Sequence, residues 1–274
     1  MAADAPVAQT PAALRDLAVD IAHEAGRLLR GFAVDRAGGA DLQIGAKSSL
    51  TDPVSEADRA SERLIAERLA VARPYDGMLG EEDQAAREGS SGLTWVVDPL
   101  DGTVNFLYGL PMWAVSIAVV DSVGSVAGAV YDPSRDEVFH AARGLGAHVD
   151  DRPIRCTGVD ELGQTLVATG FAYDPDVRAD QGRFAAQLLG VVRDLRRGGS
   201  AALDLCWVGA GRLDAYIEYG LQPWDWAAGR LIVDEAGGVV SEHQATFGGR
   251  SHTGVCAGGR AAHDRLVAWL EARP

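Results

Sequence analysis

The sequence WVVDPLDGTVNF occupies residues 95–106 and combines a strand pattern, two aspartates and a helix start. The apolar residues up to Val97 predict a strand that ends at Asp98, and Gly102-Thr103 predicts that a helix begins shortly afterwards. Asp98 and Asp101 are therefore expected at the C-terminal end of a strand, beside helix N–H groups that suit an anion such as phosphate. Two neighbouring carboxylates repel each other and a phosphate unless cations lie between them. Magnesium, which prefers oxygen ligands and shares phosphate oxygens, meets this requirement.

The same two aspartates could be ordinary turn residues, because Asp, Pro and Gly all favour turns. Three further acidic segments argue for a site instead, since each is expected at a helix start or a strand end. One is Gly80-Glu81-Glu82, which follows a strand. The other two each open a helix, and they are DPVSEAD at residues 52–58 and WDWAAG at residues 224–229.

Composition limits the possible functions. The chain has 274 residues, of which 47% are hydrophobic, so it can bury a large core and is not expected to be disordered. Its net charge of −14 argues against nucleic acid or an anionic membrane as the main partner. No stretch approaches the roughly 18 apolar residues of a membrane span, and the first residues lack the pattern of a signal peptide. We therefore expect a cytoplasmic protein.

The order of patterns along the chain predicts a layered mixture of helices and strands. No internal repeat or low-complexity linker is present, so a boundary near residue 150 would divide one compact body. Helices are expected at residues 11–32, from 51 to about 74, at 180–193 and 200–208, and from Trp224 and Ala261; strands are expected at 78–80, 94–97, 113–120, 126–131, up to Thr169 and at 213–217.

Cysteine and histidine residues contribute little to this interpretation. Cys156, Cys206 and Cys256 lie about fifty residues apart, without a CxxC pair or a histidine at ligand spacing, and are expected to be small buried residues. The six histidines fall outside every motif, so a phosphohistidine mechanism has no candidate. We expect them to be ordinary surface or core residues.

Taken together and in this order, the acidic segments resemble the inositol monophosphatase family. The Glu235–Gly238, Gly198–Ala202 and Asp214–Glu218 segments add to the match, which extends over nearly the whole chain from about residue 14. The resemblance implies an α+β fold, a layered αβαβα sandwich. It also implies one phosphatase unit over residues 1–274, with a metal-binding half at 11–150 and a half at 151–274 that completes the site.

The resemblance implies two or three Mg²⁺ ions in the site. Glu81, Asp98 and the backbone carbonyl of Leu100 would hold one ion, and Asp98, Asp101 and Asp225 a second. A third ion is expected near Glu81 with help from Asp58. Lys47 matches a lysine near the metals but could equally be a solvated loop residue, and Glu82 matches a position that binds no metal.

Catalysis and substrate binding are implied in the same way. Glu81, Thr103 and Asp58 would be catalytic, with Thr103 and Glu81 orienting the attacking water. The N–H groups of Gly102 and Thr103 would bind the phosphate. The remaining substrate contacts are expected from Gly199, Ser200, Ala201, Glu218 and Asp225. Asp204 and Asp214 are expected to be structural, at a helix surface and a strand start.

The expected activity is magnesium-dependent hydrolysis of inositol monophosphate by direct attack of a metal-activated water. The resemblance also implies inhibition by lithium and a homodimer. Histidinol phosphate remains an alternative substrate, because Glu218 could pair with its amine. Fructose 1,6-bisphosphate and adenosine bisphosphate are further alternative substrates. Phosphatases with an aspartate nucleophile carry a D-x-D-x-T pattern, but two residues separate Asp98 from Asp101, which disfavours that mechanism. A non-enzymatic alternative is a regulator that binds other proteins.

Overall fold

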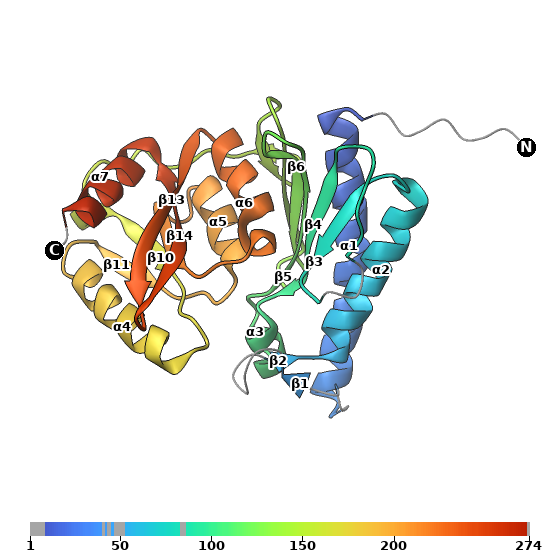
Figure 1. Ribbon diagram of the computed structural model, residues 1–274, viewed down its shortest axis with the longest axis horizontal. Coiled ribbons are helices and arrows are strands. Elements are labelled where there is room, and N and C mark those ends of the chain that lie inside the picture. The colour runs from blue at the N-terminus through green and yellow to red at the C-terminus, as the bar shows by residue number, and fades with distance from the viewer. Residues whose placement is uncertain (1–8, 40–41, 43–44, 47–52, 83–85, 273–274) are drawn as a thin grey trace, which may run out of the picture.

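The computed structural model describes residues 9–39, 42, 45–46, 53–82 and 86–272, which form five layers (Figure 1). Helices α1 (Pro11–Ala37) and α2 (Glu56–Ala72) cover one face of a seven-stranded sheet. Helices α5 (Ala201–Gly209) and α6 (Pro223–Glu235) lie between this sheet and a five-stranded sheet. Helices α4 (Pro175–Leu189) and α7 (Arg260–Glu271) cover the outer face of the second sheet. The predicted α+β class with αβαβα layering is confirmed.

The seven-stranded sheet has the strand order β3-β4-β5-β6-β7-β8-β9. Only β3 and β4 pair in parallel, while each later strand pairs antiparallel with the one before it. The strands are β3 (Gly77–Gly80), β4 (Thr94–Asp101), β5 (Ala114–Val120), β6 (Ser125–Asp132), β7 (Glu137–Ala142), β8 (Ala147–Val149) and β9 (Arg152–Pro153).

The five-stranded sheet has the order β11-β10-β12-β14-β13. Strand β10 pairs in parallel with β11 and β12, and β14 pairs antiparallel with β12 and β13. The strands are β10 (Leu166–Thr169), β11 (Asp194–Arg196), β12 (Ala215–Tyr219), β13 (Gly238–Phe247) and β14 (Arg250–Gly259). The other elements are α3 (Thr103–Tyr108), the 3₁₀ turn Leu162–Gln164 and the short pair β1 (Gly45–Ala46) and β2 (Pro53–Val54).

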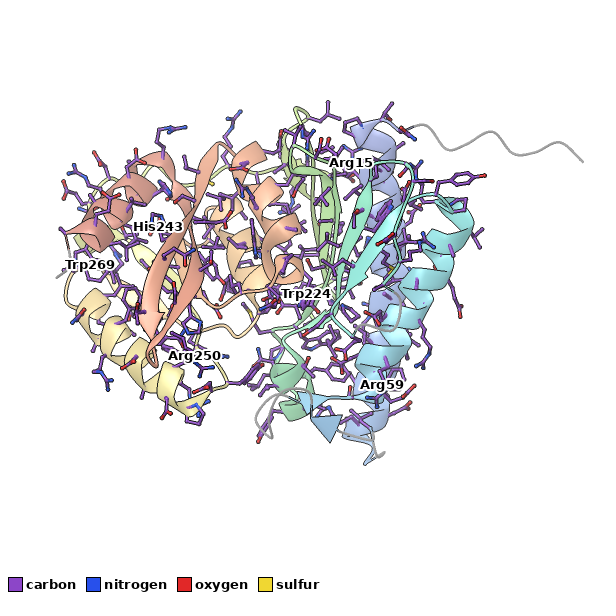
Figure 2. The ribbon with its side chains drawn as sticks, viewed as in Figure 1. Arg15, Arg59, Trp224, His243, Arg250 and Trp269 are labelled. Atoms are coloured by element: carbon purple, nitrogen blue, oxygen red, sulfur yellow. The ribbon has the colours of Figure 1, made fainter. Side chains whose placement is uncertain are left out.

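Strand β4 is buried along almost its whole length, because helices cover both faces of its sheet. Its side chains alternate between two cores: Trp95 and Val97 pack on the α1 and α2 side, whereas Val96 packs toward α5 and α6. This burial on both faces explains the continuous apolar run that predicted the strand. Trp224, at the start of α6, lies in the middle of the molecule (Figure 2). None of the described helices is long and apolar enough to cross a membrane.

Several element boundaries differ from the predictions. The second helix was expected from residue 51 but begins at Glu56, because Ser55 and Asp58 form a reciprocal capping box there. Pro53–Val54 instead forms β2, while Thr51 and Asp52 lie outside the described residues. Helix α4 begins five residues early, since the Asp174 side chain caps it.

Smaller differences affect the first helix and both sheets. Helix α1 continues to Ala37, beyond the expected end at residue 32, and the strand expected at 213–217 begins at Ala215. Strands β7, β8, β9, β11, β13 and β14 were not predicted. Strand β13 alternates between partly exposed and exposed side chains over much of its length, so its apolar pattern is weak.

Candidate active site

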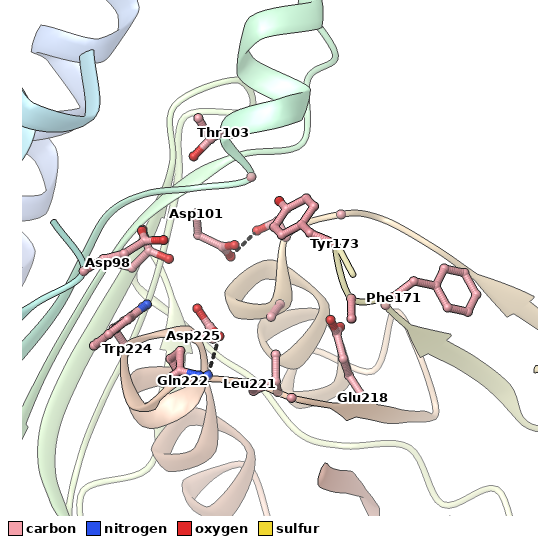
Figure 3. A pocket seen from close by; sticks show the side chains of 18 of the residues that line it. Asp98, Asp101, Thr103, Phe171, Tyr173, Glu218, Leu221, Gln222, Trp224 and Asp225 are labelled. Carbon is pink, nitrogen blue, oxygen red and sulfur yellow. Dashed lines mark hydrogen bonds between the residues drawn. The ribbon is translucent and has the colours of Figure 1, made fainter. Parts of the chain in front are cut away.

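A pocket of about 410 Å³ lies where the ends of β4 and β12 face the starts of α5 and α6 (Figure 3). Apart from Asp58, every residue expected to bind metal or substrate lines it: Glu81, Asp98, Leu100, Asp101, Gly102, Thr103, Gly199, Ser200, Ala201, Glu218 and Asp225. Asp58 is fully buried behind this lining and contacts Thr103. The structure therefore brings together residues from six separate segments of the chain.

The two aspartates of β4 reach the same pocket because the strand is irregular between them. Side chains three positions apart on a regular strand point to opposite faces of the sheet. The pairing of β4 with β5 shifts register between Asp98 and Asp101, which allows both carboxylates to face the pocket. Asp98 Oδ1 also accepts a hydrogen bond from the backbone N–H of Leu100 at 3.0 Å.

Gly102 connects β4 to α3 in a left-handed conformation, with φ of 90° and ψ of 35°. A Cβ at this position would lie 2.8 Å from the carbonyl oxygen of Met112 and 3.3 Å from that of Gly199. Only glycine therefore fits the turn without strain or displacement. The turn places Thr103 at the start of α3, facing the pocket.

The hydroxyl of Thr103 lies between two acceptors. Its oxygen is 3.0 Å from Asp58 Oδ1 and 3.1 Å from the carbonyl oxygen of Leu100. Asp58 Oδ2 accepts hydrogen bonds from the backbone N–H and the hydroxyl of Ser55, at 2.8 and 2.6 Å. Asp58 is thus held rigidly, and the Thr103 hydroxyl can donate inward while its oxygen remains an acceptor on the pocket side.

Asp101 connects the end of β4 to the start of helix α5. Its Oδ2 accepts a hydrogen bond of 2.6 Å from the Ser200 hydroxyl and one of 2.8 Å from the backbone N–H of Ala202. Ser200 is also the N-cap of α5 and accepts from the N–H of Leu203. The start of α5 and the end of β4 therefore position each other.

Asp225 and Glu218 approach the pocket from the second half of the chain. Asp225 lies in the first turn of α6, where its Oδ2 accepts a hydrogen bond from the backbone N–H of Gln222 at 2.7 Å. Glu218, on β12, accepts a hydrogen bond of 2.9 Å from the Tyr216 hydroxyl. A Cβ on Gly170 would collide with both carboxylate oxygens of Glu218, so this glycine makes room for the carboxylate.

Burial and mutual repulsion disfavour the charged forms of these carboxylates. Burial raises the pKa of Asp98 well above its usual range, and the charges of Glu81, Asp101 and Asp225 raise it further. Burial likewise raises the pKa of Asp101 to about 7, against the opposing hydrogen bonds from Ser200 and Ala202. The pKa of Asp225 is raised by burial and by Asp101 and Glu81. A set of carboxylate oxygens that repel one another in this way fits a hard divalent cation.

Some residues of the pocket were not predicted from the sequence. Phe171 and Tyr173 line it, as does Arg197, whose positive charge lowers the pKa of Glu218 against the larger effect of burial. Asn105 donates hydrogen bonds to the carbonyl oxygens of Met112 and Gly198, and so ties α3 to the segment before α5. The only sequence signal for Arg197 was its position directly before Gly198-Gly199.

Other acidic residues also differ from expectation or lie elsewhere. Asp204 was predicted at a helix surface but is buried on α5, where burial and the charge of Glu218 raise its pKa. Asp214 accepts hydrogen bonds from the Thr157 hydroxyl and the backbone N–H of Leu166, a structural role as predicted. Glu82 does not line the pocket, and Lys47 lies outside the described residues.

Comparison with known proteins connects this geometry to a family. The family model described as the inositol monophosphatase family matches residues 11–273. Inositol-1-monophosphatase SuhB of Mycobacterium tuberculosis is 48% identical over 271 residues, covering 94% of this chain and 93% of that protein. Nus factor SuhB of Pasteurella multocida is 44% identical over 214 residues, covering 77% of this chain and 78% of that protein. The crystal structure of extragenic suppressor protein suhB from Bartonella henselae superposes with a TM-score of 0.86 at 37% identity, covering 96% of this chain and 100% of that chain.

Proposed function

The chain belongs to the inositol monophosphatase family, and on that premise we propose that it is a magnesium-dependent phosphatase that hydrolyses inositol monophosphate. The observation that carries the proposal is the meeting of Asp98, Asp101 and Asp225 in one pocket with Glu218. Three carboxylates suit the cations that a phosphate requires, and the fourth suits a substrate rich in hydroxyl groups.

The proposed metal ligands offer the oxygen atoms that magnesium prefers, and they line the same pocket. Glu81, Asp98 and the Leu100 carbonyl would hold one ion, and Asp98, Asp101 and Asp225 a second, with a third near Glu81. Magnesium, when bound, supplies positive charge that stabilises the phosphoryl group and favours an attacking water. Asp101 is proposed to bind metal while it keeps its hydrogen bonds from Ser200 and Ala202.

Thr103, Glu81 and Asp58 are the proposed catalytic group. Because Asp58 accepts from the Thr103 hydroxyl, the threonine oxygen can in turn accept a hydrogen bond from a water in the pocket. Glu81 would accept a hydrogen bond from the other O–H of that water, orient the water toward phosphorus and take up this one proton as the new P–O bond forms. The N–H groups of Gly102 and Thr103 would hold the phosphate oxygens while the ester P–O bond breaks. The leaving alkoxide takes a proton from solvent water, and Glu81 returns its proton to solvent, so the protons balance.

Glu218 is the proposed selector of the alcohol. An ionised carboxylate accepts hydrogen bonds from two neighbouring hydroxyls, and the Tyr216 hydroxyl keeps one of its oxygens in place. Gly199, Ala201 and Asp225 are proposed to contact the ring from the other sides. Ser200 would contribute mainly through its backbone, because its hydroxyl already donates to Asp101.

The test compares kcat/KM of the purified enzyme for inositol 1-phosphate, histidinol phosphate, fructose 1,6-bisphosphate and adenosine bisphosphate, all with Mg²⁺. We expect inositol 1-phosphate to give the highest value. A preference for histidinol phosphate would instead assign Glu218 to the substrate amine. In a single turnover in labelled water, we expect one solvent oxygen in the phosphate and no trapped phosphoenzyme.

A second function, as a regulator that binds other proteins, is favoured by the relative that carries the name Nus factor SuhB. A regulatory role independent of catalysis should persist in an Asp98→Asn variant, whereas a role that depends on hydrolysis should be lost with it. Complementation of a chromosomal deletion by this variant separates the two.

A homodimer and a cytoplasmic location are the remaining parts of the proposal. Sedimentation at several protein concentrations measures the first, and cell fractionation measures the second. A monomer at all concentrations would remove the dimer from the proposal without affecting the assignment of the pocket.

A further inference from the structure

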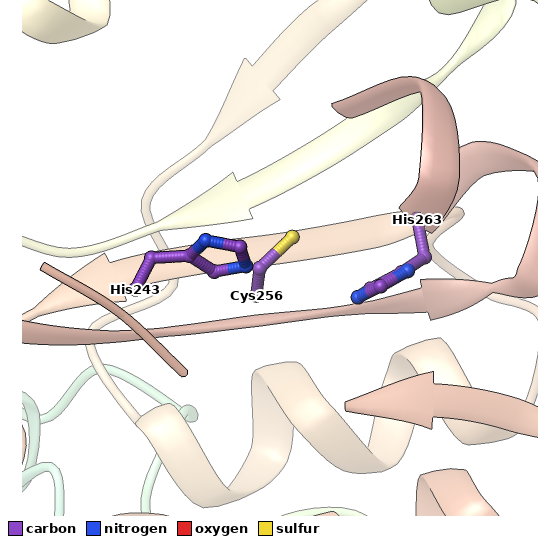
Figure 4. Close-up of side chains that lie close together, drawn as sticks. All are labelled: His243, Cys256 and His263. Atoms are coloured by element: carbon purple, nitrogen blue, oxygen red, sulfur yellow. The ribbon is translucent and has the colours of Figure 1, made fainter. Parts of the chain in front are cut away.

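Two histidines and a cysteine that lie apart in the sequence meet on the outer face of the five-stranded sheet. His243 comes from β13, Cys256 from β14 and His263 from the first turns of α7. One potential ligand atom from each side chain lies within 4.8 Å of the other two (Figure 4). The sulfur of Cys256 lies between the two imidazole rings in this view.

The sheet register explains why the three side chains meet. Cys256 pairs with Ser241 across the β13–β14 ladder, so the two side chains leave the same face. His243 follows Ser241 by two residues and therefore shares that face. Helix α7 begins directly after β14 and folds back over this face, which brings His263 to the same point.

The imidazole nitrogens are oriented toward the centre of this cluster. The Nε2 atoms of His243 and His263 both lie 2.7 Å from the hydroxyl oxygen of Ser241. The other nitrogen of His263, Nδ1, lies 3.0 Å from Asp264 Oδ1. A carboxylate that accepts the Nδ1 proton leaves the Nε2 lone pair facing inward, an arrangement typical of metal-binding histidines.

We propose that His243, Cys256 and His263 form a second metal site, which takes a thiophilic divalent cation of the Zn²⁺ type. Two imidazole nitrogens and one thiolate suit Zn²⁺, whereas Mg²⁺ prefers oxygen ligands and would not compete. The Ser241 hydroxyl or a water fills the fourth position. Metal binding displaces the thiol proton of Cys256, which is released to solvent.

The required movement is small. Zn–N and Zn–S bonds of about 2.0–2.3 Å place tetrahedral ligand atoms about 3.3–3.7 Å apart, so the side chains must close by about 1 Å. Cys256 and His263 are buried, whereas His243 is partly exposed and provides the approach from solvent. Without metal, the Ser241 hydroxyl can donate to one Nε2 and accept from the other, which keeps the cluster hydrogen-bonded.

The expected consequence of metal binding is structural. The ion would join α7 to β14 and to β13, which is the edge strand of its sheet. Strand β12, beside β14, carries Glu218. Glu218 pairs with Val255, which neighbours Cys256 along β14, so the Glu218 side chain points to the face of the sheet opposite Cys256. Zn²⁺ should therefore stabilise the sheet that positions Glu218 without entering the phosphatase pocket.

The test titrates the metal-stripped, reduced full chain with Co²⁺ in excess Mg²⁺. Only a site with a cysteine ligand gives a thiolate-to-cobalt charge-transfer band in the near ultraviolet. We expect the band to saturate at one Co²⁺ per chain and to vanish when Zn²⁺ is added, since Zn²⁺ binds such sites more tightly. Zn²⁺ should also raise the melting temperature of the chain.

Variants assign the band to its ligands. Cys256→Ser should abolish the charge-transfer band. His243→Gln and His263→Gln should weaken Co²⁺ binding at least about tenfold, since loss of even a residue that only hydrogen-bonds to a metal ligand lowers metal affinity by that factor. The matched controls are Cys206→Ser, another buried cysteine, and His252→Gln on the same hairpin, and both should keep the band.

Absence of the band in the unmodified chain would overturn the proposal and leave a hydrogen-bonded cluster. Its persistence in Cys256→Ser would do the same. If Cys256→Ser does not fold, His243→Gln decides, because this residue is partly exposed and glutamine still offers a donor to Ser241. Unchanged Co²⁺ affinity and an unchanged Zn²⁺ effect on its melting temperature would contradict the site.

Discussion

Asp98 combines two conditions that rarely coexist without a cation: it is almost fully buried, and other carboxylates surround it. We predict that Asp98→Asn lowers kcat by far more than tenfold, which corresponds to over about 1.4 kcal/mol in the activation barrier. The fold should persist, because the asparagine oxygen can still accept from the Leu100 N–H. Retention of more than a tenth of kcat would contradict the proposed role.

The control for this variant is Asp204→Asn, which removes another buried carboxylate whose pKa is raised. Without metal, both variants should melt at a higher temperature than the unmodified chain, because each loses an unfavourable buried charge. Only Asp98→Asn should also lose the stabilisation by Mg²⁺. Equal responses of the two variants to Mg²⁺ would remove Asp98 from the metal ligands.

Glu218 is predicted to act on specificity alone. Glu218→Gln should lower kcat/KM for inositol 1-phosphate by about one to two powers of ten, since a hydrogen bond to a charged group contributes about 1.5–3 kcal/mol. Glycerol 2-phosphate, which lacks the ring, should be hydrolysed as before. Glutamine can still accept from Tyr216, so the fold should not change. An equal loss for both substrates would instead assign Glu218 a structural or metal-related role.

The turn between β4 and α3 positions the pocket, and Gly102 determines its geometry. Gly102→Ala places a Cβ against neighbouring backbone atoms and forces alanine into a positive φ of 90°. Gly92→Ala also forces alanine into a positive φ, of 83°, but its Cβ would meet no atom within 4 Å. We expect Gly92→Ala to lower the free energy of unfolding by about 1–2 kcal/mol, and Gly102→Ala to lower it clearly further. Urea denaturation measures both. Equal losses would show that the close approach at Gly102 costs nothing.

Elements with a local signal could be predicted from the sequence, and those that depend on distant pairing could not. The apolar run of β4 ends at Asp98-Pro99, and the strand was predicted there. Its irregular pairing with β5, which turns Asp98 and Asp101 to one side, depends on the neighbouring strand. The one local signal was Pro99, which has no N–H for regular pairing and was interpreted as the end of the strand. The β13–β14 hairpin was missed although Gly248-Gly249, both at positive φ, form its two-residue loop.

The candidate site followed the same rule. Its acidic residues were predicted because they come in short motifs at element ends. Arg197 and Asn105 were missed because their roles depend on segments brought near by folding. The cluster of His243, Cys256 and His263 depends on the register of one hairpin and the return of α7, so spacing along the chain could not reveal it.

At the scale of the whole molecule, we propose that residues 11–150 and 151–274 work as one unit. Helices α5 and α6 pack against both sheets, and Asp101 accepts hydrogen bonds from the start of α5. Buried surface shared in this way couples the unfolding of the two sheets. Calorimetry of the full chain should therefore show one transition.

The same calorimetry should show a pH dependence of opposite sign with and without metal. Since the pKa of Asp101 is raised to about 7, and those of Asp98 and Asp225 are raised too, the unfolded chain loses these protons first as pH rises. These groups should therefore destabilise the metal-free protein increasingly from about pH 4 to above pH 7. Mg²⁺ should reverse the effect, and stabilise more at about pH 8 than at about pH 5. If these groups instead stabilised the metal-free protein as the pH rises to neutral, that result would contradict their burial.

Release of phosphate from inositol 1-phosphate by exhaustively chelated enzyme, before and after Mg²⁺ is restored, tests the central claim most directly. The carboxylates of the pocket repel one another and the substrate until cations neutralise them, so we predict no turnover without metal and full turnover with it. Ca²⁺, with its larger radius and looser coordination, should not replace Mg²⁺. Full activity of the chelated enzyme would contradict the claim that this pocket is a magnesium-dependent phosphatase site.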